Sequence, residues 1–299
     1  MSKGTIIIDS GEVIENATYY THQEQEQRKR FYETRQQMKI VTDKCKSYFK
    51  RYISGFNRLD DLDSQEATRL MYLATYTSYD DNILKYDNGV VLKKKDIYKI
   101  MNISDESCRN TLKKFIEKGY ITETENGYQI NKDIIHRGND KEHKLDSNER
   151  YTRIFIQAMR KMYLSVKPTQ HKLLGYVFQM LPYVNIYHNI LCYNPYEKDI
   201  DAIQPINMIE FCRMLGLDDK NITRFRKNAE KVIFDFMGKK QHFMCYLLSA
   251  EDDNKNQGMI IINPNILYNE HEYNRVETIG LFYANDKISI KEKRLKSSE

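Results

Sequence analysis

Two β-prone runs around Asn126-Gly127 are the feature that most constrains the fold of this 299-residue chain. Tyr120-Ile121-Thr122 lies before the dipeptide and Tyr128-Gln129-Ile130 follows it. Asn-Gly between such runs is the strongest short-range signal for a β-hairpin, because both residues tolerate the positive φ of a type I′ turn. We therefore predict a hairpin over residues 120–130.

Three amphipathic segments precede this hairpin. Ser64 is expected to cap the first helix, and a second, short helix runs over residues 93–101 and is ended by Asn102. The third is expected over residues 104–118, with Ser104 as its N-cap and a glycine directly after it. Two short helices joined by a tight turn are typical of a helix-turn-helix, and a hairpin directly after them makes a winged helix.

The same order of elements returns in the second part of the chain, where an amphipathic helix is expected over residues 151–166. Asp218 is expected to cap a helix over residues 218–237, and a larger hairpin is expected from residues 243–248 and 259–262. Three short stretches recur in the same order, which favours duplication of one structural unit. They are residues 82–86 with 189–193, 96–103 with 210–217, and 130–134 with 262–266.

These patterns predict an α+β fold, mainly α, of two tandem winged-helix domains with an N-terminal helical arm. Within the arm, residues 4–15 suggest a short hairpin, and residues 22–53 suggest one or two amphipathic helices that pack on the domain, dimerise or contact phosphates. The expected division is an arm over 1–60, a first winged helix over 61–138, a linker over 139–150, a second winged helix over 151–270 and a basic tail over 271–299.

Composition narrows the classes of function. The net charge of +5 is mildly basic, so only the distribution of charge can indicate a polyanionic partner. Five scattered cysteines suggest neither a disulfide framework nor a zinc site. No phosphate-binding Gly-Lys loop and no His-Glu-x-x-His occurs, so we expect a binding protein rather than an enzyme, without cofactor or metal. The apolar run Ile6-Ile7-Ile8 is too short to cross a membrane, and a cytoplasmic location is expected.

The two expected recognition helices carry the candidate DNA-binding residues. The second helix of a helix-turn-helix enters the major groove, where arginine and asparagine can read base edges and lysine contacts phosphates. The candidates of the first domain are Lys93, Lys94, Lys95, Ser107, Arg109, Asn110, Lys113, Lys114 and Asn126. Those of the second are Lys220, Asn221, Thr223, Arg224, Lys227 and Lys231. Exposed tyrosines that stack on unpaired bases are a lesser alternative, with Tyr79, Tyr86, Tyr183, Tyr187 and Tyr193 as examples.

Several of these strings resemble winged-helix replication or regulatory proteins of plasmids and phages from low-GC Gram-positive bacteria. They are Tyr79 to Asn82, Asn88-Gly89, Lys95-Asp96-Ile97, Ile103-Ser104, Lys118 to Ile121, Ile130 to Gly138 and Ile262-Asn263-Pro264. The resemblance extends over about residues 64–270. Lys132 departs from it, because the family pattern usually has proline there.

The resemblance implies a replication initiator that binds origin repeats on double-stranded DNA, in the bacterial cytoplasm and associated with the nucleoid. Under this interpretation, the expected protein partners are a second copy of the chain, which would form a homodimer, and the replication or transcription machinery. Two alternatives stay open: a transcriptional repressor or activator of a phage or mobile element, and a structural or dimerisation adaptor on DNA. Burial or carboxylate pairing of Arg224 and Lys227 would favour the adaptor.

Overall fold

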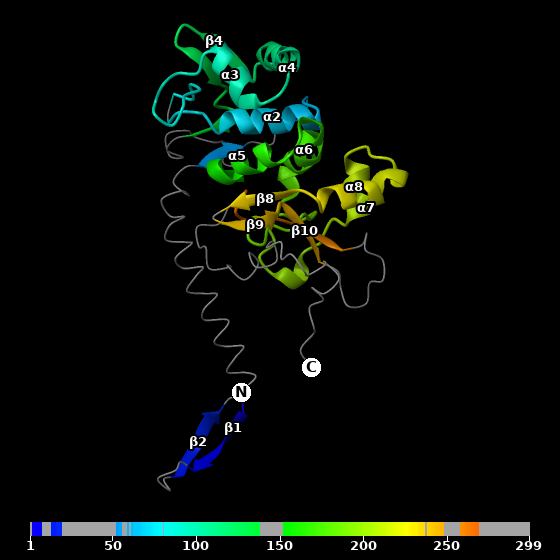
Figure 1. Ribbon diagram of the computed structural model, residues 1–299. Helices are drawn as coiled ribbons and strands as arrows, with labels where there is room; N and C mark the ends of the chain where they lie inside the picture. Colours follow the sequence, from blue (N-terminus) through cyan, green and yellow to red (C-terminus); the bar gives the residue numbers. More distant parts are fainter. Residues whose placement is uncertain are drawn as a thin grey trace. The chain divides into compact units, whose positions relative to one another are not determined.

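The computed structural model describes residues 2–7, 13–19, 52–55, 59, 61–79, 81–137, 152–236, 238–247 and 258–268. The chain divides into an N-terminal part, Met1–Ser47, and a main body, Tyr48–Glu299. In the N-terminal part, β1 (Ser2–Ile7) and β2 (Val13–Tyr19) pair as antiparallel strands (Figure 1), which confirms the predicted hairpin. The helix expected over 22–53 lies outside the described residues up to 51, and its last two positions belong to a strand.

The first half of the main body, residues 61–137, contains three helices followed by a hairpin. These are α2 (Ser64–Ala74), α3 (Lys94–Met101), α4 (Asp105–Glu117), β4 (Ile121–Thr124) and β5 (Gly127–Ile130). Ser104 caps α4 as predicted, since its side chain accepts a hydrogen bond from the Ser107 amide. Ile121 pairs with Ile130 and Thr124 with Gly127, which confirms the predicted hairpin, with Glu125 and Asn126 as its two turn residues.

The cap of α2 differs from the prediction by one residue. Asp63 is the N-cap, and it forms a capping box in which its side chain accepts from the Glu66 amide while Glu66 accepts from the Asp63 amide. Ser64 is the first helical residue, and its hydroxyl donates to Oε1 of Gln179 at 2.8 Å. A carboxylate and a hydroxyl both cap helices well, so the sequence alone did not distinguish these neighbours.

The second half, residues 152–268, repeats the order of elements with additions. Its strands are β7 (Thr152–Phe155), β8 (Ile233–Phe236), β9 (Lys239–His242), β10 (Met244–Leu247) and β11 (Met259–Ile262). Its α-helices are α5 (Ile156–Ser165), α6 (His171–Gln179), α7 (Met208–Met214) and α8 (Ile222–Ala229). Short 3-10 turns lie at Pro168–Gln170, Leu181–Tyr183, Ile200–Ala202 and Asp219–Asn221.

Two helix predictions in this half are wrong in extent. The helix expected over 218–237 begins only at Ile222, after a 3-10 turn that Asp218 precedes without a side-chain capping bond. It ends at Ala229, because Ile233–Phe236 alternates between exposed and buried side chains and pairs with β9 as a strand. The helix expected from residue 151 begins only at Ile156, since Thr152–Phe155 forms β7. The expected large hairpin is confirmed, because Met244 pairs with Ile262 across β10 and β11.

A small sheet joins the two halves. β3 (Tyr52–Gly55) is central, with β6 (Ile135–His136) antiparallel on one side and β7 antiparallel on the other. Leu267 continues the sheet beyond β7 through a bridge to Ile154. The pairings connect residues far apart in the sequence, so they hold the two halves together.

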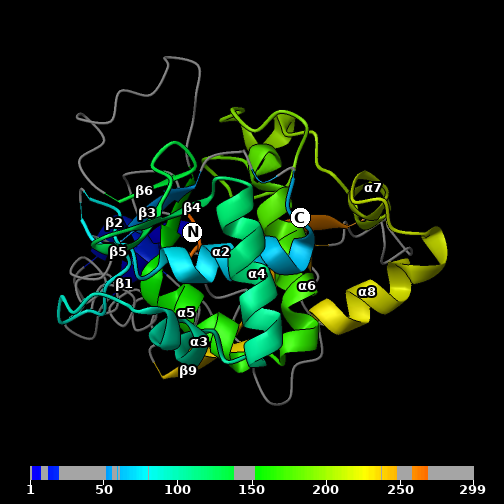
Figure 2. The same cartoon turned by 90° about the horizontal axis from the view of Figure 1, so that it is seen from above.

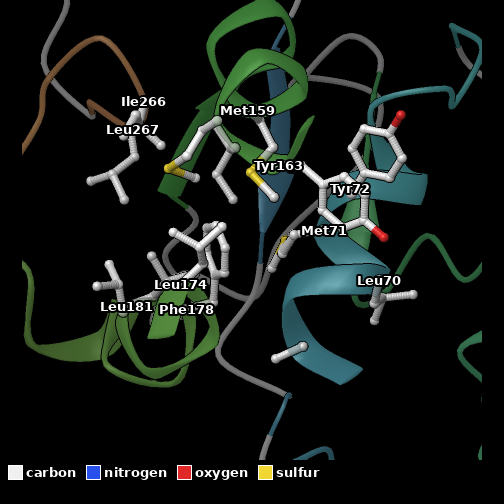
Figure 3. Packing of buried hydrophobic residues seen from close by; sticks show 14 of the residues in the cluster. Leu70, Met71, Tyr72, Met159, Tyr163, Leu174, Phe178, Leu181, Ile266 and Leu267 are labelled. Carbon is white, nitrogen blue, oxygen red and sulfur yellow. The ribbon is translucent and has the colours of Figure 1, made fainter. Parts of the chain in front are cut away.

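One hydrophobic core extends across both halves. Helices α2 and α6 lie side by side in Figures 1 and 2, and buried side chains from both meet there, including Met71 and Phe178 (Figure 3). Tyr72 of α2 stacks on Tyr163 of α5 with ring centroids 3.7 Å apart. The mixed helices and small antiparallel sheets confirm the α+β class. Among the described residues, the apolar helices are all too short to traverse a bilayer.

Candidate nucleic-acid interface

Helix α4 is fixed on α2 by two polar contacts. Arg69 of α2 donates through Nη1 to Oγ1 of Thr111 at 2.8 Å, and Lys114 of α4 forms an ion pair with the buried carboxylate of Glu66. The hydrogen bond that Lys114 donates to Glu66 raises the pKa of the Lys114 ammonium group, so this lysine stays charged. Both contacts attach one side of α4 to the core and leave its opposite side in solvent.

The outward side of α4 presents Arg109, Asn110 and Lys113, all exposed. These positions lie on one face of a helix because they are separated by one, three and four residues. Lys113 approaches Glu117 to 3.5 Å, but both side chains are well exposed and such a surface pair contributes little. Lys113 is therefore free to exchange this neighbour for a phosphate.

The other candidates of the first half lie on the neighbouring elements of the chain. Lys93, Lys94 and Lys95 are exposed at the start of α3, and Asn126 is exposed in the turn of the β4–β5 hairpin. Ser107 is half-buried near the N-terminus of α4. Lys114 differs from the rest, because its ion pair with Glu66 gives it a role in positioning α4.

Helix α8 is anchored by aromatic packing. Phe225 of α8 packs against Tyr176 of α6 and Phe211 of α7, with centroid distances of 5.4 and 5.5 Å. Arg213 of α7 and Asp219 form an ion pair of 2.8 Å that connects the two helical elements of this turn. The same pair lowers the pKa of the Asp219 carboxyl. The candidate residues of this half, Lys220, Asn221, Thr223, Arg224, Lys227 and Lys231, are all exposed.

The loop before the two short helices contains a left-handed asparagine in both halves. Asn82 and Asn189 are buried with φ values of 58° and 56°. The Asn82 amide donates to the carbonyls of Ile130 and Ile135 at 3.2 and 2.6 Å. The Asn189 amide donates to those of Ile262 and Leu267 at 3.3 and 2.7 Å. Each asparagine thus connects this loop to the end of its own hairpin. The stretches that recur in the sequence at residues 82–86 and 189–193 therefore have equivalent positions in the structure.

The two short helices of each half and the turn between them correspond as well. Asp96 accepts from the Lys93 amide at 2.9 Å at the start of α3, and Glu210 accepts from the Asn207 amide at the same distance at the start of α7. Asn102 after α3 and Gly216 after α7 both have positive φ, 50° and 66°. Counting onward from these turns pairs Arg109 with Thr223, Asn110 with Arg224, and Lys113 with Lys227. Three candidates of each half therefore occupy equivalent exposed positions.

The two faces differ in charge at their ends. Glu106 and Glu117 flank the exposed face of α4, whereas lysines stand at the equivalent positions 220 and 231. The α8 face is therefore the more positive one.

The positioning residues were not among the candidates. Arg69 and Glu66 contact residues of α4 that lie far along the chain, and a single sequence carries no signal for such pairs.

Of the tyrosines proposed to stack on bases, Tyr79 and Tyr193 are exposed, while Tyr86, Tyr183 and Tyr187 are half-buried. Within the part of the chain that the structure describes, no cluster of three potential metal ligands was found.

Comparison with known families bears on the first half. Residues 21–154 match the family model described as Firmicute plasmid replication protein (RepL). This match confirms the resemblance to plasmid replication proteins of Gram-positive bacteria, and it spans α2, α3, α4 and the β4–β5 hairpin. No curated protein and no solved structure gave a match.

Proposed function

We propose that residues 61–138 and 151–270 are tandem winged-helix units that bind double-stranded DNA sequence-specifically through α4 and α8. The observation that carries the proposal is the placement of Arg109, Asn110 and Lys113 at the same exposed positions as Thr223, Arg224 and Lys227. Each helix follows a short helix and a tight turn and precedes a hairpin, the order in which a recognition helix occurs.

The residue types suit the two tasks of such a helix. Arg109 and Arg224 can donate two hydrogen bonds to guanine O6 and N7, and Asn110 can pair similarly with adenine. Lys113 and Lys227 suit phosphates, as do the exposed lysines at 93, 94 and 95. Phosphate contacts fix the register of the protein on the duplex, and base contacts provide its sequence preference.

The family match supports replication as the process, and we propose that the chain is a non-catalytic initiator at the origin of its replicon, in the bacterial cytoplasm. The adaptor alternative requires α8 to have lost its DNA face. Arg224 and Lys227 are exposed, and neither pairs with a carboxylate among the described residues. Their availability favours DNA contact over a dimerisation role.

Footprinting tests this proposal. The purified chain is incubated with fragments that tile its own replicon at about 0.15 M salt, with random duplex as competitor. We expect protection of a repeated array at an AT-rich origin, and unchanged protection with the control variant Lys161→Ala, an exposed lysine of α5 outside both helix-turn-helices. A single protected palindrome over a promoter would make the chain a regulator. Binding no tighter than to random DNA would overturn the proposal.

A further inference from the structure

The two halves are related by a local two-fold rotation. β3 and β7 pair antiparallel, with Ser54 opposite Arg153, Tyr52 opposite Phe155 and Gly55 opposite Thr152. β6 lies against the outer side of β3, and Leu267 lies against the outer side of β7. Each half therefore contributes one inner and one outer segment, and rotation about the Ser54 and Arg153 pair exchanges them.

The crossing of α2 and α6 obeys the same rotation. Oγ1 of Thr68 donates to the His171 carbonyl at 2.7 Å, and Gly175 lies against the Ser64 carbonyl so closely that an added Cβ would overlap it. Thr68 and Gly175 are equivalent positions of their helices, as are Ser64 and His171. The two contacts are therefore the same contact seen from either half.

Both recognition helices are attached to this symmetric centre in the same way. Arg69 of α2 contacts Thr111 of α4, and at the equivalent positions Tyr176 of α6 contacts Phe225 of α8. The attachment sites match although the chemistry changed from a hydrogen bond to aromatic packing. It follows that the two-fold rotation that exchanges α2 and α6 also exchanges α4 and α8.

We propose that one copy of the chain reads an inverted pair of half-sites that differ in sequence. The inference rests on the proposed DNA-binding function and adds the orientation of the site and the stoichiometry. Two-fold related recognition helices in homodimers bind inverted half-sites, and this chain carries both helices itself. The half-sites differ because Arg109 and Asn110 on α4 are replaced by Thr223 and Arg224 on α8.

The distance between the half-sites is fixed by contacts that break the symmetry. Arg160 of α5 binds Asp87 of the first half at 2.9 Å, and its Nε donates to Oγ1 of Thr75 at 3.0 Å. The Tyr163 hydroxyl donates to the Met101 carbonyl at the end of α3 at 2.8 Å. Helix α5 belongs to the second half and contacts the first half close to α3. These contacts keep the two proposed DNA-reading faces at a fixed distance from each other.

The test uses duplexes made from the footprinted site. In one, the second half-site is reversed in place, and in another about 5 bp, half a helical turn, separate the half-sites. We expect one chain per natural duplex by native mass spectrometry, and at least about tenfold weaker binding to each altered duplex in fluorescence anisotropy. Arg109→Ala should relax base preference in one half-site and Arg224→Ala in the other, whereas Lys161→Ala should change neither.

Several results would overturn the inference while leaving specific DNA binding intact. They are two chains on a site with identical half-sites, equal binding to the reversed duplex, or effects of both arginine variants in the same half-site. Loss of specific binding to the natural site would instead refute the proposed function.

Discussion

Replacement of Asn82 by alanine tests how the hairpin of the first half is held. The side chain of Asn82 donates to two carbonyls and accepts from the Arg137 amide at 3.2 Å, and its backbone is left-handed. Alanine in this conformation costs about 1 kcal/mol, and the loss of buried partners costs about 2 kcal/mol more. We expect Asn82→Ala to lower the free energy of unfolding by about 3 kcal/mol in urea denaturation.

Matched variants separate the two contributions. Asn82→Gly keeps the left-handed backbone accessible, so it should be about 1 kcal/mol less destabilising than alanine. Asn189→Ala should cost somewhat less than Asn82→Ala, because Oδ1 of Asn189 has no hydrogen-bond partner among the described residues. Asn88→Ala, in an exposed turn, should remain within about 0.5 kcal/mol of the parent. Losses below that level for both Asn82 and Asn189 would refute the reasoning.

Three further predictions concern the crossing, pH and salt. Gly175→Ala should destabilise by about 2 kcal/mol or more in urea denaturation, because its Cβ would overlap the Ser64 backbone; an unchanged midpoint would contradict this. Burial lowers the pKa of His171 to about 4, against 6.5 unfolded, so unfolded chains bind more protons between these values and stability falls as pH drops from about 6.5 to 4. His171→Phe should remove up to about 3 kcal/mol of that pH dependence, and identical pH profiles of parent and variant would refute the assignment. The double variant Lys220→Ala/Lys227→Ala should flatten the slope of log affinity against log salt by about 1.8, since each lost phosphate contact contributes about 0.9; an unaltered slope would remove α8 from the interface.

The parts of the fold that were predicted correctly from the sequence are those that depend on interactions between residues close together in the chain. The N-cap of Ser104 and the hairpin signal of Asn126-Gly127 act within a few residues, so their outcome depends little on the remainder of the chain. The repeat was detectable for a related reason, because the asparagines at 82 and 189 perform the same backbone task and therefore persist in both halves.

Long-range pairing accounts for what the sequence did not predict. β7 was expected to be helical, and it is a strand because β3, about a hundred residues earlier, pairs with it. Similarly, the sequence placed Lys114 with the other lysines of a basic helix face, because the ion pair with Glu66 joins residues that are distant in the chain. The end of α8 is a different case, since the alternation in Ile233–Phe236 was readable as a strand.

The candidate interface was predictable at the level of the helix face. Exposure of Arg109, Asn110 and Lys113 follows from the apolar spacing of α4, which assigns Cys108, Leu112 and Phe115 to the core. The two-fold relation between α4 and α8 was not predictable, because it depends on the strand pairing and on the α2–α6 crossing. Symmetry of this kind is a property of the assembled body and leaves no trace in local periodicity.

The most direct test of DNA recognition compares affinities for the footprinted site and for random duplex at one salt concentration. Arg109→Ala should lose about 1–3 kcal/mol on the specific site and little on random DNA, whereas Lys113→Ala should weaken both equally. This pattern would identify α4 as a reading helix. Equal losses from Arg109→Ala on both duplexes would contradict the assignment, and no loss on either would remove α4 from the DNA interface.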